Sequence, residues 1–244
     1  MRIPLTKYGW PQVVIIPGAL LAAMIFFAVY GFPFAGEDGE GYHGLSLWAF
    51  ILIEVVLGCV LVFSLAFFRD PRRSCPSDMS LLLAPADGRV TDIEISGDNG
   101  FIDGTALRIG IFLSILDTHI NRMPCNVKVE EITYKKGRYK NAMSPESARV
   151  NESNTLSLTR TDSPEDRLVV RQISGAIARR IVCKTRAGDR LSAGDKFGMI
   201  KYGSRTELYV TVHDSKYKIK CLVKKGDKVK AGLTPLARYE TCRN

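Results

Sequence analysis

The chain has 244 residues, 46% of them hydrophobic and 24% charged, and a formal net charge of +9. This length accommodates one sizeable domain and an additional segment. The positive charge favours an acidic partner, such as anionic lipid or nucleic acid. No helix-turn-helix, zinc-finger or RNA-binding aromatic motif is present, which argues against nucleic acid. With 3 histidines in all and no Cys-x-x-Cys pair, the sequence does not predict a metal site.

Two long apolar segments come first in the chain. Residues 13–34 and 48–68 are each predicted to form a helix long enough to cross the hydrocarbon core of a bilayer. Re-entrant or interfacial helices are the alternative. The connecting residues 36–44 contain acidic residues but no Lys or Arg, whereas basic residues flank the outer ends of both segments. The positive-inside rule therefore predicts that residues 1–73 anchor the rest of the chain at the cytoplasmic side of the cell membrane.

Residues 74–244 are expected to form a mostly β domain, because short apolar runs alternate with turn-forming residues. The predicted strands are 88–95, 106–113, 127–134, 155–158, 168–173, 176–185, 207–212 and 216–223, with a short helix within 144–153. The pattern Gly-Asp-basic-aliphatic-x-Ala-Gly occurs at 188–194 and again at 226–232. Since each copy begins and ends with turn residues, the pair predicts a β-sandwich or barrel-sandwich with quasi-repeated hairpins.

Three segments contain the residue types that carry chemistry. They are residues 85–90 (PADGRV), 117–124 (DTHINRMP) and 197–207 (FGMIKYGSRTE). Taken singly, none is specific: Asp-Gly is usually a turn, a single histidine after a strand is usually structural, and Gly-Ser is usually a loop. Together, in this order and behind a membrane hairpin, they resemble the short form of the pyruvoyl-dependent phosphatidylserine decarboxylase family over nearly the whole chain. Arg122 departs from the longer form of the family, which has a second histidine at this place.

The resemblance implies that the chain cuts itself between Gly203 and Ser204. Ser204 Oγ would attack the carbonyl carbon of Gly203, His119 would take the serine proton, and Asp87 would orient His119. Loss of a proton from Cα of Ser204 would then release the Gly203 carboxylate and leave dehydroalanine, which tautomerises and is hydrolysed by water to a covalent pyruvoyl group and ammonia. The products would be a β chain of residues 1–203 and an α chain of residues 204–244.

The resemblance also implies the substrate and its binding groups. The pyruvoyl ketone derived from Ser204 would form a Schiff base with phosphatidylserine and accept the electrons released with CO₂, giving phosphatidylethanolamine. Apart from the resemblance, the charges of Arg122, Arg205 or nearby lysines make them candidates to bind the lipid phosphate, and solvated surface charge is the alternative. His213 is interpreted as structural. The expected partners are the membrane phospholipid and the α and β chains themselves, with no nucleic acid, and the sequence is compatible with a homo-oligomer.

Other functions remain open on the sequence alone. An archaetidylserine decarboxylase would use the same mechanism on a lipid with isoprenoid tails. A lipoyl or biotinyl carrier would display a lysine on a tight turn flanked by methionine or acidic residues, and no such turn is present. A non-enzymatic, membrane-anchored sandwich adaptor would share the hairpin and the repeat, but it would not need Asp87, His119 and Gly203-Ser204 together.

Overall fold

The protein is described by a computed structural model of the uncut chain. The described residues are 4–31, 34–35, 42–43, 45–97, 100–102, 104–144, 146–176, 180–201, 203–212 and 217–241. Most of the predicted external loop and all of His213 lie outside them. The chain forms two compact units, Met1–Asp70 and Pro71–Asn244. The sequence placed this boundary at residue 73.

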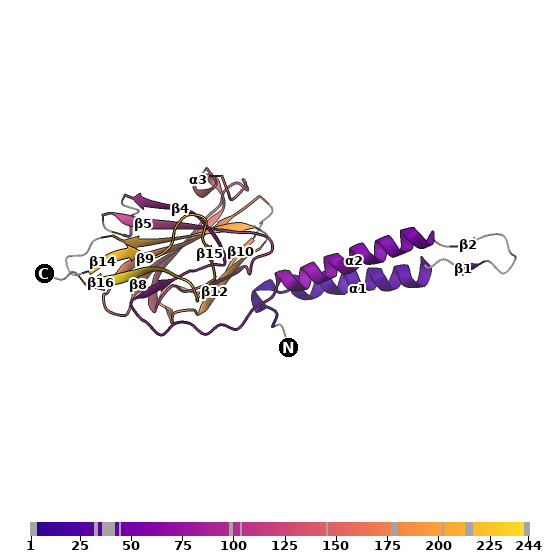
Figure 1. Cartoon of the computed structure of the whole chain (residues 1–244), viewed down its shortest axis with the longest axis horizontal. Helices are drawn as coiled ribbons and strands as arrows, with labels where there is room; N and C mark the ends of the chain where they lie inside the picture. The colour runs from indigo at the N-terminus through magenta and orange to yellow at the C-terminus, as the bar shows by residue number, and fades with distance from the viewer. Residues whose placement is uncertain are drawn as a thin grey trace. The chain divides into compact units, whose positions relative to one another are not determined.

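The first unit is a helical hairpin. It consists of η1 (Lys7–Gly9), α1 (Gln12–Tyr30), the paired strands β1 (Phe34–Ala35) and β2 (Tyr42–His43), and α2 (Leu47–Phe67). The two long helices lie side by side (Figure 1). An 18-residue stretch in each helix has a mean hydropathy of 2.5 in α1 and 2.7 in α2. Only 6% and 11% of these two stretches, respectively, are buried. Apolar side chains therefore cover the outside of the hairpin, as expected for helices in contact with lipid.

The first helix is shorter than the sequence predicted. It ends at Tyr30 rather than at residue 34, and the N–H of Gly31 donates to the carbonyl of Phe27 at 2.8 Å. Glycine is a poor helix former and is common where helices end. The remaining 19 residues are still close to the length that spans a bilayer.

The base of the hairpin is closed by backbone hydrogen bonds. Thr6 N–H donates to the carbonyl of Phe68 at 2.9 Å, and Asp70 N–H donates to the carbonyl of Pro4 at 2.7 Å. Gly9 allows this closure, since a Cβ at that position would lie 2.5 Å from Cδ1 of Phe68. The segments before and after the two helices are thus held together.

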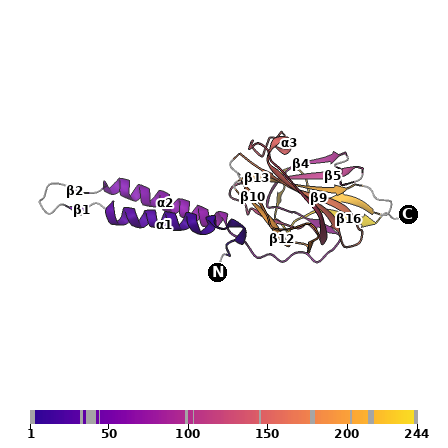
Figure 2. The same cartoon turned by 180° about the vertical axis from the view of Figure 1, so that it is seen from behind.

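The second unit is built from antiparallel sheets. Its elements are β3 (Leu81–Leu83), β4 (Gly88–Ser96), β5 (Ala106–Leu113), β6 (Ile120–Arg122), β7 (Val127–Lys135), α3 (Ser147–Val150), β8 (Ser153–Arg160), β9 (Arg167–Ser174), β10 (Arg180–Cys183), β11 (Arg190–Leu191), β12 (Lys196–Lys201), β13 (Ser204–Thr211), β14 (Tyr217–Cys221), β15 (Lys228–Val229) and β16 (Pro235–Thr241). The largest sheet has the order β11-β7-β8-β9-β13-β5-β4-β15, and two smaller sheets have the orders β10-β12-β6 and β14-β16-β3. One face of the large sheet packs on the main hydrophobic core. Figure 2 shows the strands of this unit from behind.

The repeated glycine pattern forms the two edges of the large sheet. Its two copies supply the short edge strands β11 and β15. At the start of each copy a glycine N–H donates to a neighbouring strand, from Gly188 to Val129 at 2.7 Å and from Gly226 to Val90 at 2.8 Å. Both glycines have positive φ, +91° and +97°, which a residue with a Cβ rarely adopts. The mostly β, quasi-symmetric fold predicted from the sequence is confirmed.

Candidate active site

His119 is held in place by a tight loop between β5 and β6. The N–H of Ser114 donates to Oδ2 of Asp117 at 2.8 Å, and the N–H of Asp117 donates to the carbonyl of Ser114 at 2.9 Å. His119 Nδ1 lies 3.0 Å from the carbonyl oxygen of Asp117, and Nε2 accepts the N–H of Gly203 at 3.2 Å. A carbonyl only accepts and an amide N–H only donates, so Nδ1 carries the proton and Nε2 presents its lone pair. The buried ring thus directs a proton acceptor at the backbone of the predicted cleavage site.

Gly203 has the backbone conformation that favours glycine. Its φ is +62°, in the left-handed region. A Cβ on Gly203 would meet only Ile115, at 3.7 Å, so conformation rather than space favours glycine here. At position 175, lack of space favours glycine: a Cβ on Gly175 would lie 2.3 Å from the carbonyl oxygen of Gly203. The carbonyl group that Ser204 would attack is therefore packed closely against the backbone that follows β9.

Ser204 is the first residue of β13 and is completely buried. It lies between Leu113 of β5 and Ser174 of β9 in the register of the large sheet. Among the described residues, the hydroxyls of Ser204 and Ser174 are both buried without a hydrogen-bond partner. Burying an unpaired hydroxyl costs about 1–3 kcal/mol. Two such groups occupy facing positions next to the predicted cleavage bond.

Arg205 lies on the opposite face of the sheet from Ser204. Leu208 of β13 belongs to the hydrophobic core, and alternate residues of a strand share a face, so Ser204 faces the core side. The Arg205 guanidinium donates to Glu207 at 2.9 Å and to Asp92 at 2.7 Å. Burial opposes its charge, but these carboxylates more than compensate, so that the pKa of Arg205 is raised. Arg205 is thus placed to balance buried acids and not to contact a group bound at Ser204.

Asp87 binds an arginine. Its two carboxylate oxygens accept from Arg73 Nη1 at 2.5 Å and Nη2 at 2.6 Å, and Oδ1 also accepts the N–H of Ala231 at 2.8 Å. Arg73 donates in addition to the carbonyl of Ala231 at 2.7 Å. In the described structure the group beside His119 Nδ1 is the Asp117 carbonyl, where the sequence predicted the Asp87 side chain. A catalytic role for Asp87 stays a prediction.

Arg122, the other predicted phosphate ligand, is also buried. Its Nη1 donates to the carbonyl of Gly194 at 3.0 Å, and its Nη2 donates to the carbonyl of Pro71 at 2.9 Å. These bonds tie the segment that enters the domain to the turn after β11. The structure therefore brings together His119, Gly203 and Ser204, and places Arg122 among backbone carbonyls.

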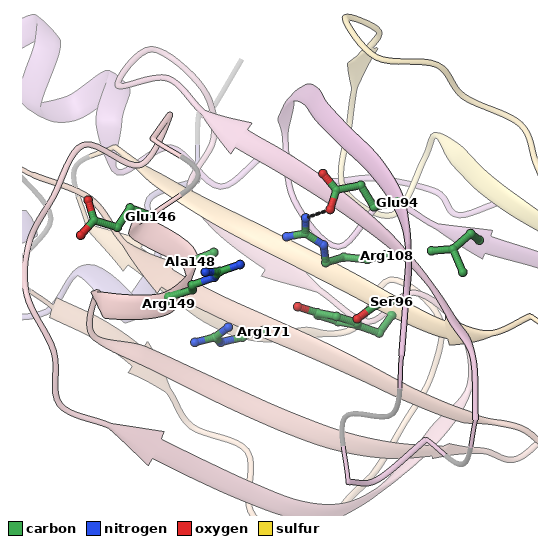
Figure 3. Close-up of a pocket in the computed structure, with 9 residues that line it drawn as sticks. Glu94, Ser96, Arg108, Glu146, Ala148, Arg149 and Arg171 are labelled. Atoms are coloured by element: carbon green, nitrogen blue, oxygen red, sulfur yellow. Dashed lines mark hydrogen bonds and ion pairs between the residues drawn. The ribbon is translucent and has the colours of Figure 1, made fainter.

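A cavity of about 590 Å³ lies on the outer face of the large sheet (Figure 3). Tyr209 and Arg108 line it, and they share the face of Arg205 because they occupy facing positions in β13 and β5. Its lining carboxylates already have cationic partners: Glu94 binds Arg108 at 2.5 Å, and Glu146 binds Lys140 at 2.6 Å. Since Ser204 faces the core side of the same sheet, this cavity is separate from the candidate cleavage site.

Sequence reasoning missed three features of the site. The Asp117 carbonyl is a backbone group, and no side-chain pattern marks which carbonyl a histidine will contact. Arg73 was counted only among the basic residues that flank the second apolar segment. Ser174 belongs to no recognised motif, although its place at the end of a predicted strand, directly before Gly175, was a usable signal.

Comparisons with known proteins point to a single family. The family model described as phosphatidylserine decarboxylase matches residues 60–237. The phosphatidylserine decarboxylase proenzyme of Carboxydothermus hydrogenoformans is 37% identical over 196 residues, which are 80% of this chain and 87% of that protein. The proenzyme of Pelodictyon phaeoclathratiforme is 35% identical over 235 residues, 96% of this chain and 99% of that protein. The proenzyme of Rhodopirellula baltica is 42% identical over 196 residues, 79% and 78% of the two chains.

Proposed function

Because the chain belongs to the phosphatidylserine decarboxylase family, we propose that it cuts itself between Gly203 and Ser204 and then converts phosphatidylserine to phosphatidylethanolamine and CO₂. The observation that carries the proposal is the arrangement at this bond. A fully buried Ser204 hydroxyl, which has no hydrogen-bond partner within the part of the chain that the structure describes, follows a glycine in the left-handed conformation. His119 Nε2 lies 3.2 Å from the nitrogen of that glycine.

Self-cleavage needs a proton acceptor beside the bond between Gly203 and Ser204. Ser204 Oγ forms a bond to the carbonyl carbon of Gly203 while its proton passes to His119 Nε2. For this step, Nε2 must release its hydrogen bond from the Gly203 N–H and accept one from the serine hydroxyl instead. The proton then moves to the departing amide nitrogen, leaving an ester between Gly203 and Ser204 Oγ. Loss of the Cα proton of Ser204 breaks the Cβ–Oγ bond, which frees the Gly203 carboxylate and leaves dehydroalanine. Water hydrolyses the imine tautomer of dehydroalanine to a ketone and releases ammonia. The Asp117 carbonyl holds the imidazole in the tautomer that this step requires.

The residues fit the pyruvoyl group that the family implies. The group would replace the buried Ser204, in a position enclosed by β5 and β9. Its ketone supplies an electron sink for the electron pair that CO₂ leaves behind. Burial of the site favours loss of the carboxylate charge, since a charged group is poorly stabilised away from water. His119 Nε2 is the group able to return a proton to the reacting carbon.

The alternatives raised by the sequence are not favoured. The relatives are named phosphatidylserine decarboxylase proenzymes, which gives no support to an archaetidylserine substrate or to a non-enzymatic adaptor. The word proenzyme in their names agrees with a precursor that is cut into two chains.

The two apolar helices associate the chain with a membrane, and the charge distribution supports a cytoplasmic catalytic unit. Arg73 is one of the basic residues that flank the second apolar segment. Its guanidinium is bound to Asp87 and its side chain is 7% exposed, so it adds little attraction to anionic lipid. A reporter fused at Gly39 should be accessible only from outside the cell. Labelling from the cytoplasmic side would contradict the orientation.

Intact-mass analysis of the purified full-length chain tests the proposed function. Wild type should give two fragments, one ending at Gly203 and one beginning with a ketone-reactive group at residue 204. Ser204→Ala should remain a single species of 27.1 kDa. The matched control, Ser157→Ala, removes a hydroxyl from a buried residue of β8 and should still be cut. An uncut, folded wild-type chain in lipid would rule out the pyruvoyl mechanism.

A further inference from the structure

The turn between β5 and β6 presents apolar side chains to the solvent. The N–H of Asp117 donates to the carbonyl of Ser114 at 2.9 Å, which makes Ile115 and Leu116 the central residues of a β-turn. Ile115 is 42% exposed and Leu116 is 68% exposed. The central positions of turns usually hold Gly, Pro, Asn, Asp or Ser. Two exposed aliphatic side chains at these positions therefore need a reason beyond the formation of the turn.

A second turn of the same kind lies between β7 and α3. The N–H of Ser144 donates to the carbonyl of Asn141 at 2.9 Å, so Ala142 and Met143 are its central residues. Ala142 is buried, whereas Met143 is 62% exposed. This turn thus also has a large apolar side chain at its tip.

Both turns lie beside the candidate cleavage bond. Cγ2 of Ile115 is 3.7 Å from the place that a Cβ on Gly203 would take. Gly175 packs against the carbonyl oxygen of Gly203, and Cβ of Ala142 is 3.3 Å from the place that a Cβ on Gly175 would take. Ser204 is completely buried, but Gly203 is partly exposed. The surface therefore comes close to residue 204 on the side of Gly203, where both turns lie.

Basic residues accompany the second turn. Three exposed cations precede it in the chain: Lys135, Lys136 and Arg138. Asn151 connects this stretch to the site, since it accepts the N–H of Lys140 at 2.9 Å and donates to the carbonyl of Ser174 at 2.8 Å. Cations at a membrane surface are attracted by anionic lipid, and phosphatidylserine is itself anionic. Exposed apolar tips next to such cations are typical of a surface that binds a bilayer.

We propose that the turns 114–117 and 141–144 form a docking surface that enters the headgroup region of an anionic bilayer and admits phosphatidylserine to residue 204. The inference rests on the proposed function. A bilayer is the occupant that fits, because two apolar helices already associate the chain with a membrane. In phosphatidylserine, moreover, only a few bonds join the reacting carbon to the glycerol that carries both acyl chains. The lipid can then react without leaving the bilayer, while Leu116 and Met143 take up contacts with its neighbours.

Fluorescence quenching by brominated lipid tests the contact directly. Trp10 and Trp48 are the two tryptophans of the chain, so the full-length protein with both replaced by Phe reports from a single introduced tryptophan. In vesicles of phosphatidylserine and brominated phosphatidylcholine, Leu116→Trp and Met143→Trp should lose most of their fluorescence. Ile95→Trp is the matched control. Ile95 is 63% exposed, but it pairs with Leu107, at the far end of β5 from the partner of Ser204, and its tryptophan should not be quenched.

Kinetics with two forms of the substrate separate docking from a general defect. At equal content of processed enzyme, Leu116→Gln and Met143→Gln should each lower kcat/KM for long-chain phosphatidylserine in vesicles about 10-fold, since one aliphatic side chain no longer leaves water. Their use of monomeric, short-chain phosphatidylserine should stay close to that of wild type, and Ile95→Gln should change neither.

Each other outcome has a distinct meaning. Unquenched tryptophans at both turns, or an equal loss with the monomeric substrate, would overturn the docking surface. Unquenched tryptophans together with a smaller particle mass of Leu116→Gln in micelles would assign the turns to a contact between two copies of the chain instead. If wild type is neither cut nor active, the proposed function fails, whereas the quenching still decides whether the turns enter the bilayer.

Discussion

The ion pair between Arg73 and Asp87 gives a quantitative prediction that separates structural from catalytic roles. The two side chains are 7% and 11% exposed, and both oxygens of Asp87 accept from the guanidinium. Removing one partner of a buried pair costs about 3–5 kcal/mol, because the other charge is left without compensation. Asp87→Ala also leaves the N–H of Ala231 without its acceptor. We therefore expect the free energy of unfolding to fall by about 4 kcal/mol, and Arg73→Gln to cause a loss of similar size.

The assay is urea unfolding of the full chain in detergent micelles, with Ser204→Ala present in every variant so that all molecules are uncut. Self-cleavage is then timed in the same variants with Ser204 restored. If Asp87 acts only through Arg73, Asp87→Asn and Arg73→Gln should slow cleavage in proportion to their loss of stability. A loss of cleavage confined to Asp87→Asn would show that Asp87 acts on His119 directly. If Asp87→Ala and Arg73→Gln each change the free energy of unfolding by less than about 1 kcal/mol, the reasoning from the ion pair is refuted.

Two further predictions concern the site. His119→Gln should slow self-cleavage by about 10²–10⁴, the usual contribution of a general base, as followed by the appearance of the α chain on gels; a normal rate would exclude His119 as the base. Gly203→Ala should destabilise the left-handed conformation by about 1–2 kcal/mol and slow cleavage about tenfold, whereas an unchanged rate would show that this conformation is not needed.

Most of the strands could be predicted because their apolar residues follow local rules. The run ALRIGIFL was predicted at 106–113, and β5 has these bounds. The segment 176–185 was predicted too long: β10 covers only Arg180–Cys183, with 177–179 outside the described residues. The expected helix within 144–153 is a single turn, α3. Strand ends and short turns depend on long-range pairing, which a local pattern does not contain.

The site shows where sequence reasoning stops. The cleavage bond and its histidine could be proposed from motifs, since each motif keeps its residues close together. The partner of Asp87 could not be proposed in this way. Arg73 lies 14 positions earlier in the chain, and the contact forms in the folded domain, where β15 pairs with β4 next to Asp87. The orientation of Arg205 could have been predicted. Successive side chains of a strand point to opposite faces, so if Ser204 faces the core, Arg205 must face the other way.

The proposed cut would separate two strands that belong to different sheets, and this has a consequence for the products. β12 pairs with β10 and β6, while β13 pairs along its length with β5 and β9. The later strands β15 and β16 pair with β4 and β3. Every one of these partners of the α chain lies before residue 204, so cleavage breaks one covalent bond and leaves the ladders intact. We expect the α and β chains to co-purify in native buffer and to separate only in denaturant. Release of the α chain from folded protein without denaturant would show that the cut disrupts β13, contrary to this topology.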